Sequence, residues 1–428
     1  MTILEIPERM TALDGEVSGE AMQRMIEMVL GARLVFAERL DPQVLARATR
    51  LLLDLEPVLG CWYEPVGKTA EWVRCESLDE QTPFEIVEST DPDAEVSHFH
   101  GSAFQARGPR IEVLLVRTST RDEVCLKLDH IAGDGWSAKE CAHLLAETYT
   151  RLLVDPDYEP VPRIGARPTY DAVWDSMSDE QRARVSTMPP PQPSKWRKRL
   201  PHSDAETFHA RSVTFSAELV ASVRQYAHSR GATVNEALLA AMLRSATRVG
   251  ESKKQDRIGF SVSADTRRLV PDVNLARISM IATTMNVLMD YDEGEPFDRT
   301  LRRVVEGIKP HRECLWDLKQ TRQKPSPVLM RTTFGFLAWT ARHWHYVSVA
   351  DMNVGRFDEA RLAFGSIRPE VAVATGPAMR FPSFPALISS YREATTIWTG
   401  FREKCVAPGV IEAWLSGTKE ELVALSRV

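Results

Sequence analysis

Cysteine is scarce in this sequence, and its spacing excludes two kinds of site. The 428 residues include six cysteines, and no two of them form a CxxC pair. Structural zinc sites and disulfide-rich secreted domains depend on paired or dense cysteines, so neither is expected. Cys125 and Cys141 lie in apolar patterns typical of small core residues. We therefore predict a reducing, cytoplasmic compartment and no metal site.

Long hydrophobic runs and an excess of positive charge are also missing. No run of about eighteen apolar residues occurs, and Met1 to Arg9 lacks the basic region and apolar core of a signal peptide. Lys and Arg number 53 against 59 Asp and Glu, which gives a net charge of -6. Proteins that bind nucleic acid through its phosphates are usually basic. We expect no membrane span, no membrane partner and no nucleic-acid partner.

Proline, by contrast, is concentrated in the middle of the chain. The stretch 154–202 holds one Asp-Pro, one Glu-Pro and one Val-Pro pair and a run of prolines before residue 194. Such density favours an extended linker, so we predict an N-terminal lobe over 1–175, a Pro-rich linker over 176–205 and a C-terminal lobe over 206–428. The basic run Lys195 to Arg199 is predicted to be a solvated linker face, with a carrier-protein or phosphate contact as the alternative.

Local patterns predict several elements outside this linker. Apolar spacing predicts a helix over 16–33 followed by a strand at 34–36, and Asp41-Pro42 predicts the start of a second helix. Capping boxes are expected at Thr233 with Glu236 and at Thr418 with Glu421, the latter opening a final helix over 418–428. Strands at 387–391 and 394–401 are expected to close the fold as a hairpin. The histidine pairs at 98/100 and 343/345 are each predicted to share a strand face without completing a metal site.

The most informative stretch runs from Val124 to Ser137 and reads V-C-L-K-L-D-H-I-A-G-D-G-W-S. Its alternating apolar residues as far as Leu128 predict a strand. His130 therefore stands where the chain leaves the sheet, held by a rigid element yet able to face a cleft. Imidazole titrates near neutral pH, so His130 is a candidate general base.

A tight turn and a helix follow this histidine. Gly133 and Gly135 flank Asp134, which suggests that backbone conformation is restricted there. Ser137 and Glu140 have the spacing of a capping box, so we expect the helix to begin at Ser137.

The resulting pattern, H-x-x-x-D-G between a strand and a helix, resembles the signature of thioester-dependent acyltransferases of the chloramphenicol acetyltransferase fold. These include nonribosomal peptide condensation domains, plant-type acyl-CoA transferases and polyketide-associated acyltransferases. His130, Asp134 and Gly135 match the signature, and Asp129 stands where condensation domains carry a first histidine. The order of the expected elements is similar from about residue 16 to residue 428, and T-V-N-E-A-L-L-A-A from Thr233 resembles the start of the family's second lobe.

The resemblance implies an α/β (α+β) fold of two similar lobes, each a mixed sheet flanked by helices, in a V shape with a tunnel between them. It implies that Asp134 has a structural role, in an ion pair with Arg267 that holds the loop. Arg268 remains open as the alternative partner. Gly135 is expected to let the N–H groups of the helix approach the acyl donor, as an oxyanion contact.

Four further residues are candidates for substrate contacts or motif positions, namely Asp129, Trp136, Asn286 and Asn353. Relatives have a G-N strand near Asn286, but Met285 precedes it here. Asn353 and Gly355 fit the S-N-x-G of condensation-type relatives. Asp351 and Gly355 fit the ends of the plant-type D-F-G-W-G, so the subfamily stays open. Asp129 either tethers a cationic amine substrate or is a hydrogen-bonded strand residue.

Taken together, the resemblance implies a condensation-type acyltransferase of nonribosomal peptide or other secondary-metabolite biosynthesis. It would move an acyl group from a thioester of coenzyme A or of a carrier protein's phosphopantetheine to an amine or hydroxyl, with His130 as base and no bound cofactor. No nucleophile elbow is apparent, which favours direct transfer in a ternary complex. We expect a stand-alone enzyme, because the sequence shows no adenylation or carrier segment. The alternative is a non-catalytic docking module of the same fold that binds a carrier protein; cyclisation or elimination is not ranked.

Overall fold

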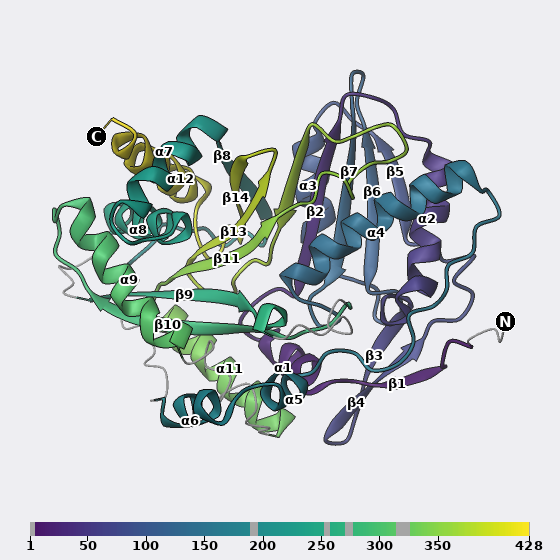
Figure 1. Cartoon of the computed structure of the whole chain (residues 1–428), viewed down its shortest axis with the longest axis horizontal. Helices are drawn as coiled ribbons and strands as arrows, with labels where there is room; N and C mark the ends of the chain where they lie inside the picture. Colours follow the sequence, from purple (N-terminus) through teal and green to yellow (C-terminus); the bar gives the residue numbers. More distant parts are fainter. Residues whose placement is uncertain (1–4, 189–195, 252–256, 270–276, 314–325, 428) are drawn as a thin grey trace.

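A computed structural model gives the fold and describes residues 5–188, 196–251, 257–269, 277–313 and 326–427. These residues form two mixed sheets of five and six strands and a small three-stranded sheet. Figure 1 shows the two large sheets in separate lobes that open apart toward the top of the view, in a V shape. The predicted two-lobed mixed fold is confirmed, whereas the tunnel between the lobes stays a prediction.

The N-terminal lobe is built on the five-stranded sheet, whose order is β12-β2-β7-β6-β5. Its strands are β2 Val29–Phe36, β5 Phe84–Glu88, β6 Ile111–Arg117, β7 Asp122–Asp129 and β12 Val371–Thr375. Helices α2 (Pro42–Leu55) and α4 (Gly135–Val154) pack on one face, and α3 (Pro92–Gly101) packs on the other. Because both faces are covered, every residue of β7 is buried, and the strand predicted from the alternating residues is confirmed.

The C-terminal lobe is built on the six-stranded sheet, in the order β10-β9-β11-β13-β14-β8. Its strands are β8 Phe208–Phe215, β9 Arg257–Asp265, β10 Ala282–Asp290, β11 Val349–Arg356, β13 Phe384–Tyr391 and β14 Ala394–Arg402. Four helices share a core with one face of this sheet: α7 Ala217–His228, α8 Val234–Arg248, α9 Phe297–Glu313 and α12 Pro408–Leu425. The expected β13–β14 hairpin and the capping box of Thr233 with Glu236 are both present.

One strand from the second half of the chain completes the first lobe. β12 pairs antiparallel with β2, from Val371 opposite Val35 to Thr375 opposite Gly31. Phe357 and Phe364, which precede β12, belong to the N-terminal core. The chain therefore crosses between the lobes after β11 and returns with β13, so the lobes are tied together by covalent chain as well as by contacts.

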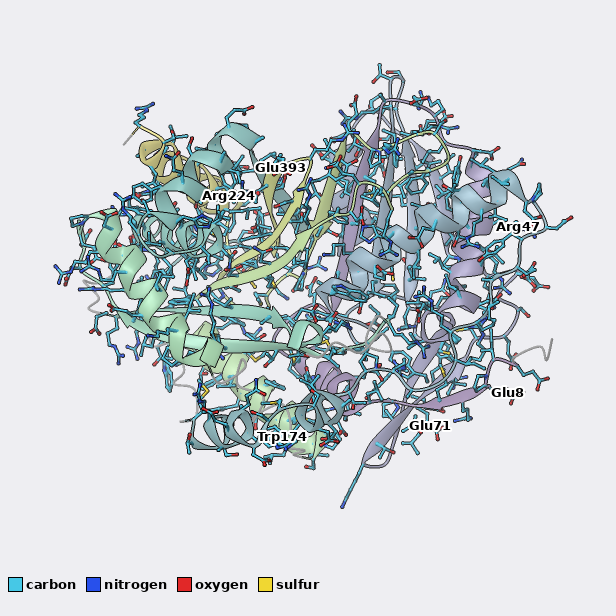
Figure 2. All side chains as sticks on the ribbon, viewed as in Figure 1. Glu8, Arg47, Glu71, Trp174, Arg224 and Glu393 are labelled. Atoms are coloured by element: carbon cyan, nitrogen blue, oxygen red, sulfur yellow. The ribbon has the colours of Figure 1, made fainter. Side chains whose placement is uncertain are left out.

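The remaining elements lie outside the two large sheets. They are α1 Asp14–Met22, α5 Tyr170–Asp175, α6 Asp179–Thr187, α11 Pro327–His343, the 3-10 turns η1 Pro57–Gly60 and η2 Thr266–Leu269, and the small sheet of β1 Arg9–Thr11, β3 Cys61–Val66 and β4 Thr69–Arg74. Figure 2 shows the side chains on these elements, with Trp174 at the lower edge of the view on α5. Helix α11 lies toward the same edge in Figure 1.

The predicted helix over 16–33 is wrong in its second half. Helix α1 ends at Met22, and Val29 already belongs to β2. The apolar residues between them have helical spacing, but residues from Val29 onward pair with β7, and those from Gly31 to Val35 pair with β12 as well. Gly31 allows this pairing, since a Cβ there would lie 1.9 Å from the carbonyl oxygen of Leu126.

Three other local predictions are also wrong. His98 and His100 lie in helix α3, which begins with Pro92 after the capping Asp91, and His343 ends helix α11. Neither histidine pair therefore shares a strand face. Thr418 starts no helix, because it lies within α12, where its buried hydroxyl donates to the Trp414 carbonyl oxygen.

The basic run before the second lobe is not a solvated face throughout. Lys195 lies outside the described residues, but Trp196 and Lys198 are each 1% exposed. Lys198 donates through Nζ to the carbonyl oxygen of Thr247, and burial lowers the pKa of this lysine to about 8. Trp196 and Leu200 belong to the C-terminal core. These residues are therefore part of the packed lobe, because alternate positions of the run turn inward.

Candidate active site

His130 is the first residue after β7, at the point where the chain turns toward α4. Its backbone N–H donates to the Met28 carbonyl oxygen, which holds the turn against the residue before β2. The imidazole is half-buried, and its Nδ1 lies 2.9 Å from the carbonyl oxygen of Gly133. A carbonyl oxygen only accepts hydrogen bonds, so Nδ1 carries the proton and Nε2 keeps its lone pair.

Burial also sets the protonation state of this histidine. It lowers the pKa of His130 below that of free imidazole, although the negative charge of Asp134 opposes the change. The side chain is therefore neutral at pH 7, with the tautomer fixed by Gly133. A neutral imidazole with a free Nε2 is the form that accepts a proton.

Asp134 is the centre of a buried polar network rather than a second proton acceptor. One carboxylate oxygen accepts from the backbone N–H and the hydroxyl of Ser137, both at 3.1 Å. The other accepts from Arg267 Nη1 at 2.7 Å and from the backbone N–H groups of Ile281 and Ala282. Burial alone would raise the pKa of Asp134, but Arg267 and these donors outweigh it and keep that pKa below its usual value.

The same network corrects the predicted start of the helix. Asp134 is the N-cap of α4, which begins at Gly135 rather than at Ser137. Glu140 does not reach back to a cap, because it forms an ion pair with Arg361 at 2.7 Å. The aspartate thus caps the helix and binds the arginine at once.

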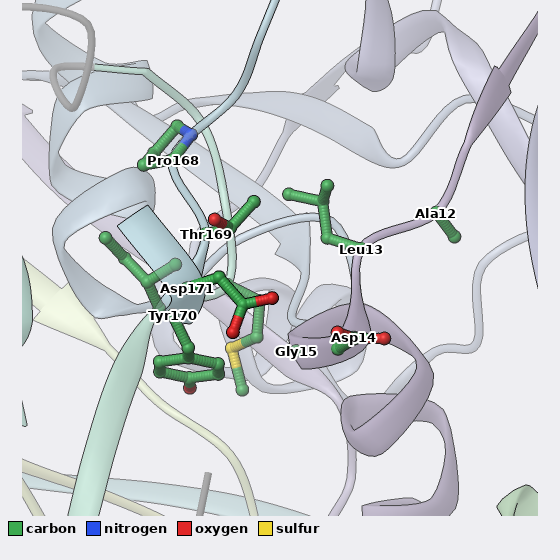
Figure 3. A pocket seen from close by; sticks show the side chains of 10 residues that line it. Ala12, Leu13, Asp14, Gly15, Pro168, Thr169, Tyr170 and Asp171 are labelled. Atoms are coloured by element: carbon green, nitrogen blue, oxygen red, sulfur yellow. The ribbon is translucent and has the colours of Figure 1, made fainter. Parts of the chain in front are cut away.

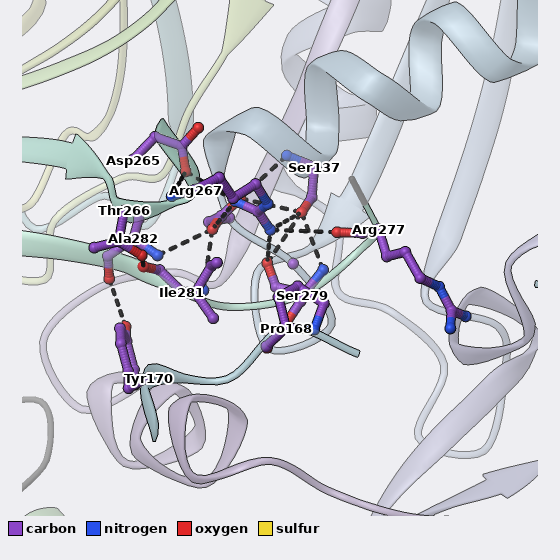
Figure 4. A network of polar contacts seen from close by, with 12 residues as sticks. Ser137, Pro168, Tyr170, Asp265, Thr266, Arg267, Arg277, Ser279, Ile281 and Ala282 are labelled. Atoms are coloured by element: carbon purple, nitrogen blue, oxygen red, sulfur yellow. Dashed lines mark hydrogen bonds and ion pairs between the residues drawn. The ribbon is translucent and has the colours of Figure 1, made fainter. Parts of the chain in front are cut away.

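Arg267, a residue of the second lobe, binds Asp134 in this loop. It lies in η2 directly after β9, and its guanidinium is enclosed by the loop of Asp134 and by the segment that leads into β10 (Figure 4). Nη2 donates to the Ser279 carbonyl oxygen at 2.8 Å, and Cζ lies 4.6 Å from the centroid of the half-buried Trp136 ring. Trp136 therefore packs on the arginine. The side chain of Arg268, the alternative partner, lies outside the described residues.

The two glycines of the turn are required because a side chain at either position would collide with a neighbouring residue. Neither Gly133 nor Gly135 has a positive φ, so the predicted backbone restriction is wrong. A Cβ on Gly133 would lie 2.6 Å from the Ser137 Cβ, and one on Gly135 would lie 2.5 Å from Cγ1 of Val354. Glycine at 135 thus lets β11 of the second lobe pack against the first turn of α4.

Asp129 is engaged within the protein. Its carboxylate accepts from the backbone N–H of Ile131 at 3.0 Å and lies 3.1 Å from Nη1 of Arg110. Burial raises the pKa of Asp129, and the nearby Arg110 opposes the change. With 4% of the residue exposed, this arrangement fits the hydrogen-bonded strand residue and leaves little room for a substrate amine.

The two candidate asparagines lie in different places. Asn286 is an exposed residue of β10, opposite Ser261 in β9, and no printed contact joins it to the loop of His130 within the described ranges. Asn353 lies on β11 next to Val354, so it is close in sequence to the residue that contacts Gly135. Its amide donates to Oδ1 of Asn235 at 2.7 Å.

The asparagine pair leads to Asp351, which the sequence indicated only as a possible motif position. Asn235 in turn donates to Asp351 Oδ2 at 2.7 Å, and the other oxygen of Asp351 has no partner among the described residues. Burial raises the pKa of Asp351 to about 7. Nothing in the sequence indicated its contact with Asn235, which lies 116 positions earlier in the chain.

A small pocket of about 150 Å³ lies next to the network (Figure 3). It is lined by the start of α1, the residues before and in α5, and the pair Met280–Ile281. Tyr170 closes one side, and its hydroxyl donates to the Ala282 carbonyl oxygen at 2.6 Å. His130 does not line this pocket, whereas Ile281, whose backbone N–H donates to Asp134, does.

Comparison with known proteins gives structural likeness only. No protein-family model matches the chain, and no curated protein matches it in sequence. The first condensation domain of the calcium-dependent antibiotic synthetase, solved with a substrate analogue, has 16% identity and a TM-score of 0.68, over 98% of this chain and 97% of that one.

Two further solved structures are similar over the whole length. The trichothecene 15-O-acetyltransferase TRI3 of Fusarium sporotrichioides has 12% identity and a TM-score of 0.69, over 97% of this chain and 95% of that one. Polyketide synthase associated protein 5 of Mycobacterium tuberculosis has 13% identity and a TM-score of 0.67, over 99% and 100%. The chain therefore has the fold that these three solved structures share.

Proposed function

We propose that the protein is a condensation-type acyltransferase with His130 as general base. The observation that carries this proposal is the hydrogen bond from Nδ1 of His130 to the Gly133 carbonyl oxygen, which leaves Nε2 unprotonated. The imidazole is half-buried at the end of a rigid strand and neutral at pH 7. This is the state that a base needs before a nucleophile is activated.

The proposed reaction joins an acceptor to an acyl thioester in one complex. The amine or hydroxyl attacks the thioester carbonyl carbon, and Nε2 of His130 takes its proton. The new C–N or C–O bond forms, the C–S bond breaks, and the imidazolium returns the proton to the departing thiolate. Holding both substrates together supplies several kcal/mol of the barrier, and a positioned base typically adds about 10² to 10⁴-fold.

The surrounding residues would hold this geometry. Asp134 and Arg267 bind one another and fix the turn, so they position His130 without carrying its proton. The first turn of α4 lies beside the turn, and the positive end of its dipole would favour the developing oxyanion. The donor would be coenzyme A or a carrier protein's phosphopantetheine, and the acceptor an amine or a hydroxyl.

The test is an assay of acyl transfer by intact mass, with a panel of acyl-CoA and acyl-carrier thioesters and mixed amine and alcohol acceptors. We expect a product with the native protein and a loss of about 10² to 10⁴-fold in His130→Ala. His98→Ala, which removes an exposed imidazole on α3, is the matched control. Retained turnover in His130→Ala would contradict the role of His130. No product from any donor, with a carrier protein retained on a column, would favour the docking module.

A further inference from the structure

Helix α11 carries an apolar surface that no part of the described chain covers. Among the described residues, twelve large hydrophobic side chains are exposed, and six of them lie in this helix or directly after it. We call these six residues the α11 patch: Val328, Leu329, Phe336, Leu337, Trp339 and Trp344. The other six are scattered between Val66 and Val371. Scattered apolar residues are normal on protein surfaces, whereas a concentration of them indicates a binding surface.

The exposure follows the period of the helix. Leu329, Phe336 and Trp339 are spaced by seven and three residues, which places them on one side, and all are exposed. Ala338 and Ala341 on the other side are buried. Surface helices normally turn their apolar side inward. In α11, by contrast, the larger apolar side chains point outward.

The aromatic residues of the α11 patch are already arranged against one another. The ring centroids of Phe336 and Trp339 are 6.0 Å apart, and those of Trp339 and His343 are 5.0 Å apart with nearly parallel rings. Trp344 packs edge-on to Tyr346 at 5.8 Å. Tryptophan is enriched where an apolar phase meets water, because its ring is apolar and its N–H is polar.

The segment that carries the α11 patch has basic residues and no acidic ones, although the whole chain carries -6. No Asp or Glu occurs from Ser326 to Ala350. Arg342 is exposed at the end of the helix, and the exposed Arg197 lies with Cζ 5.3 Å from the Tyr346 ring. Arg331 differs, since it is paired with Glu20 of α1 at 2.8 Å. Exposed arginines beside tryptophan and phenylalanine match the surface of an anionic bilayer.

We propose that the α11 patch binds the surface of an anionic lipid bilayer, with Phe336 and Trp339 entering the headgroup region and Arg197 and Arg342 near lipid phosphates. This goes beyond the proposed function and does not depend on it. The sequence predicted no membrane partner because it has no spanning segment, and no helix in the described ranges is long and apolar enough to cross a bilayer. A helix that lies in the interface needs neither property.

The test is flotation of the full chain with vesicles of equal parts phosphatidylcholine and phosphatidylglycerol, beside vesicles of phosphatidylcholine alone. We expect binding to the anionic vesicles that weakens with salt. The double variant Phe336→Ser/Trp339→Ser should bind at least about tenfold more weakly. Arg342→Gln should lower the affinity for anionic vesicles about fivefold and leave the affinity for neutral vesicles unchanged.

A matched control keeps this result specific. Val154→Ser/Val161→Ser removes two exposed apolar residues away from α11 and should bind as the native chain does. Circular dichroism and thermal unfolding establish that each variant is folded. The proposal is overturned if the native chain does not float with anionic vesicles, or if the Phe336/Trp339 variant floats equally well. A dimer that the same variant abolishes, without vesicle binding, would overturn it too and assign the surface to a second copy.

Discussion

Nη1 of Arg267 lies 2.7 Å from the carboxylate of Asp134, although 133 positions separate the two residues in the chain. Both side chains are buried, and the pair joins the loop after His130 to the second lobe. Asp134→Ala would leave a buried guanidinium without its main partner. We expect a loss of about 3 kcal/mol in the free energy of unfolding, measured by urea denaturation. The lower end of the usual range is expected, because Asp265 remains 3.2 Å from Arg267.

Asp265→Asn is the control for this pair. It removes the second, more exposed carboxylate and should cost less than about 1.5 kcal/mol, because Asp134 still binds the arginine. If Asp134→Ala were no more destabilising than Asp265→Asn, the network would not hold the lobes as inferred.

The protonation of His130 gives a second prediction. Burial lowers its pKa, so the imidazole stays neutral to a lower pH than free imidazole does. The rate constant kcat/KM should rise with pH through a midpoint that lies below about 6.5, and it should reach a plateau above that midpoint. The same midpoint should appear in an NMR titration of the ring, assigned by comparison with His130→Gln. A midpoint above that of free imidazole would mean that the charged form is stabilised instead.

The contact between Gly135 and Val354 gives a third prediction. Gly135→Ala places a Cβ 2.5 Å from the valine side chain, and we expect a loss of about 1–3 kcal/mol in stability. Val354→Ala in the same chain makes room for this methyl group, so the double variant should lose less than the sum of the single variants.

A second glycine serves as the matched control for this contact. Gly409 near the start of α12 has no positive φ and no atom within 4 Å of its Cβ position. Gly409→Ala should therefore not destabilise the protein. Simple additivity of Gly135→Ala and Val354→Ala in thermal or urea unfolding would show that the two residues do not interact.

The features that the sequence predicted well are local ones. The capping box of Thr233 with Glu236 and the β13–β14 hairpin depend on residues only a few positions apart. His130 could be identified as a candidate because a strand pattern, a turn and a helix pattern follow one another within one stretch. Its Nδ1 partner, Gly133, also lies in that stretch.

The features that the sequence did not predict depend on distant segments. The cap of α4 is Asp134 rather than Ser137 because this aspartate also receives Arg267 and two N–H groups from Ile281 and Ala282. No local pattern reports those donors. The start of β2 was not predicted either, because this strand is stabilised by pairing with β12, which lies far along the chain. A periodicity of apolar residues cannot register a partner that arrives more than 300 residues later.

Asp351 gives the last prediction, because its carboxylate is buried and no cation among the described residues pairs with it, which must cost stability. Its pKa is raised to about 7, so between its unfolded pKa near 3.8 and that value the folded protein binds more protons than the unfolded chain. Stability therefore falls as pH rises through this range, and the cost is complete above it. Asp351→Asn keeps the shape and can still accept from Asn235. The free energy of unfolding of this variant should exceed that of the native chain by roughly 2–4 kcal/mol near pH 8 and by almost nothing near pH 4.

Urea denaturation at both pH values measures this difference. Asp290→Asn on β10 is the exposed control, and its free energy of unfolding should lie within about 0.5 kcal/mol of the native value at either pH. Equal gains at the two pH values would show that Asp351 is not charged when buried, and that its cost arises from packing instead.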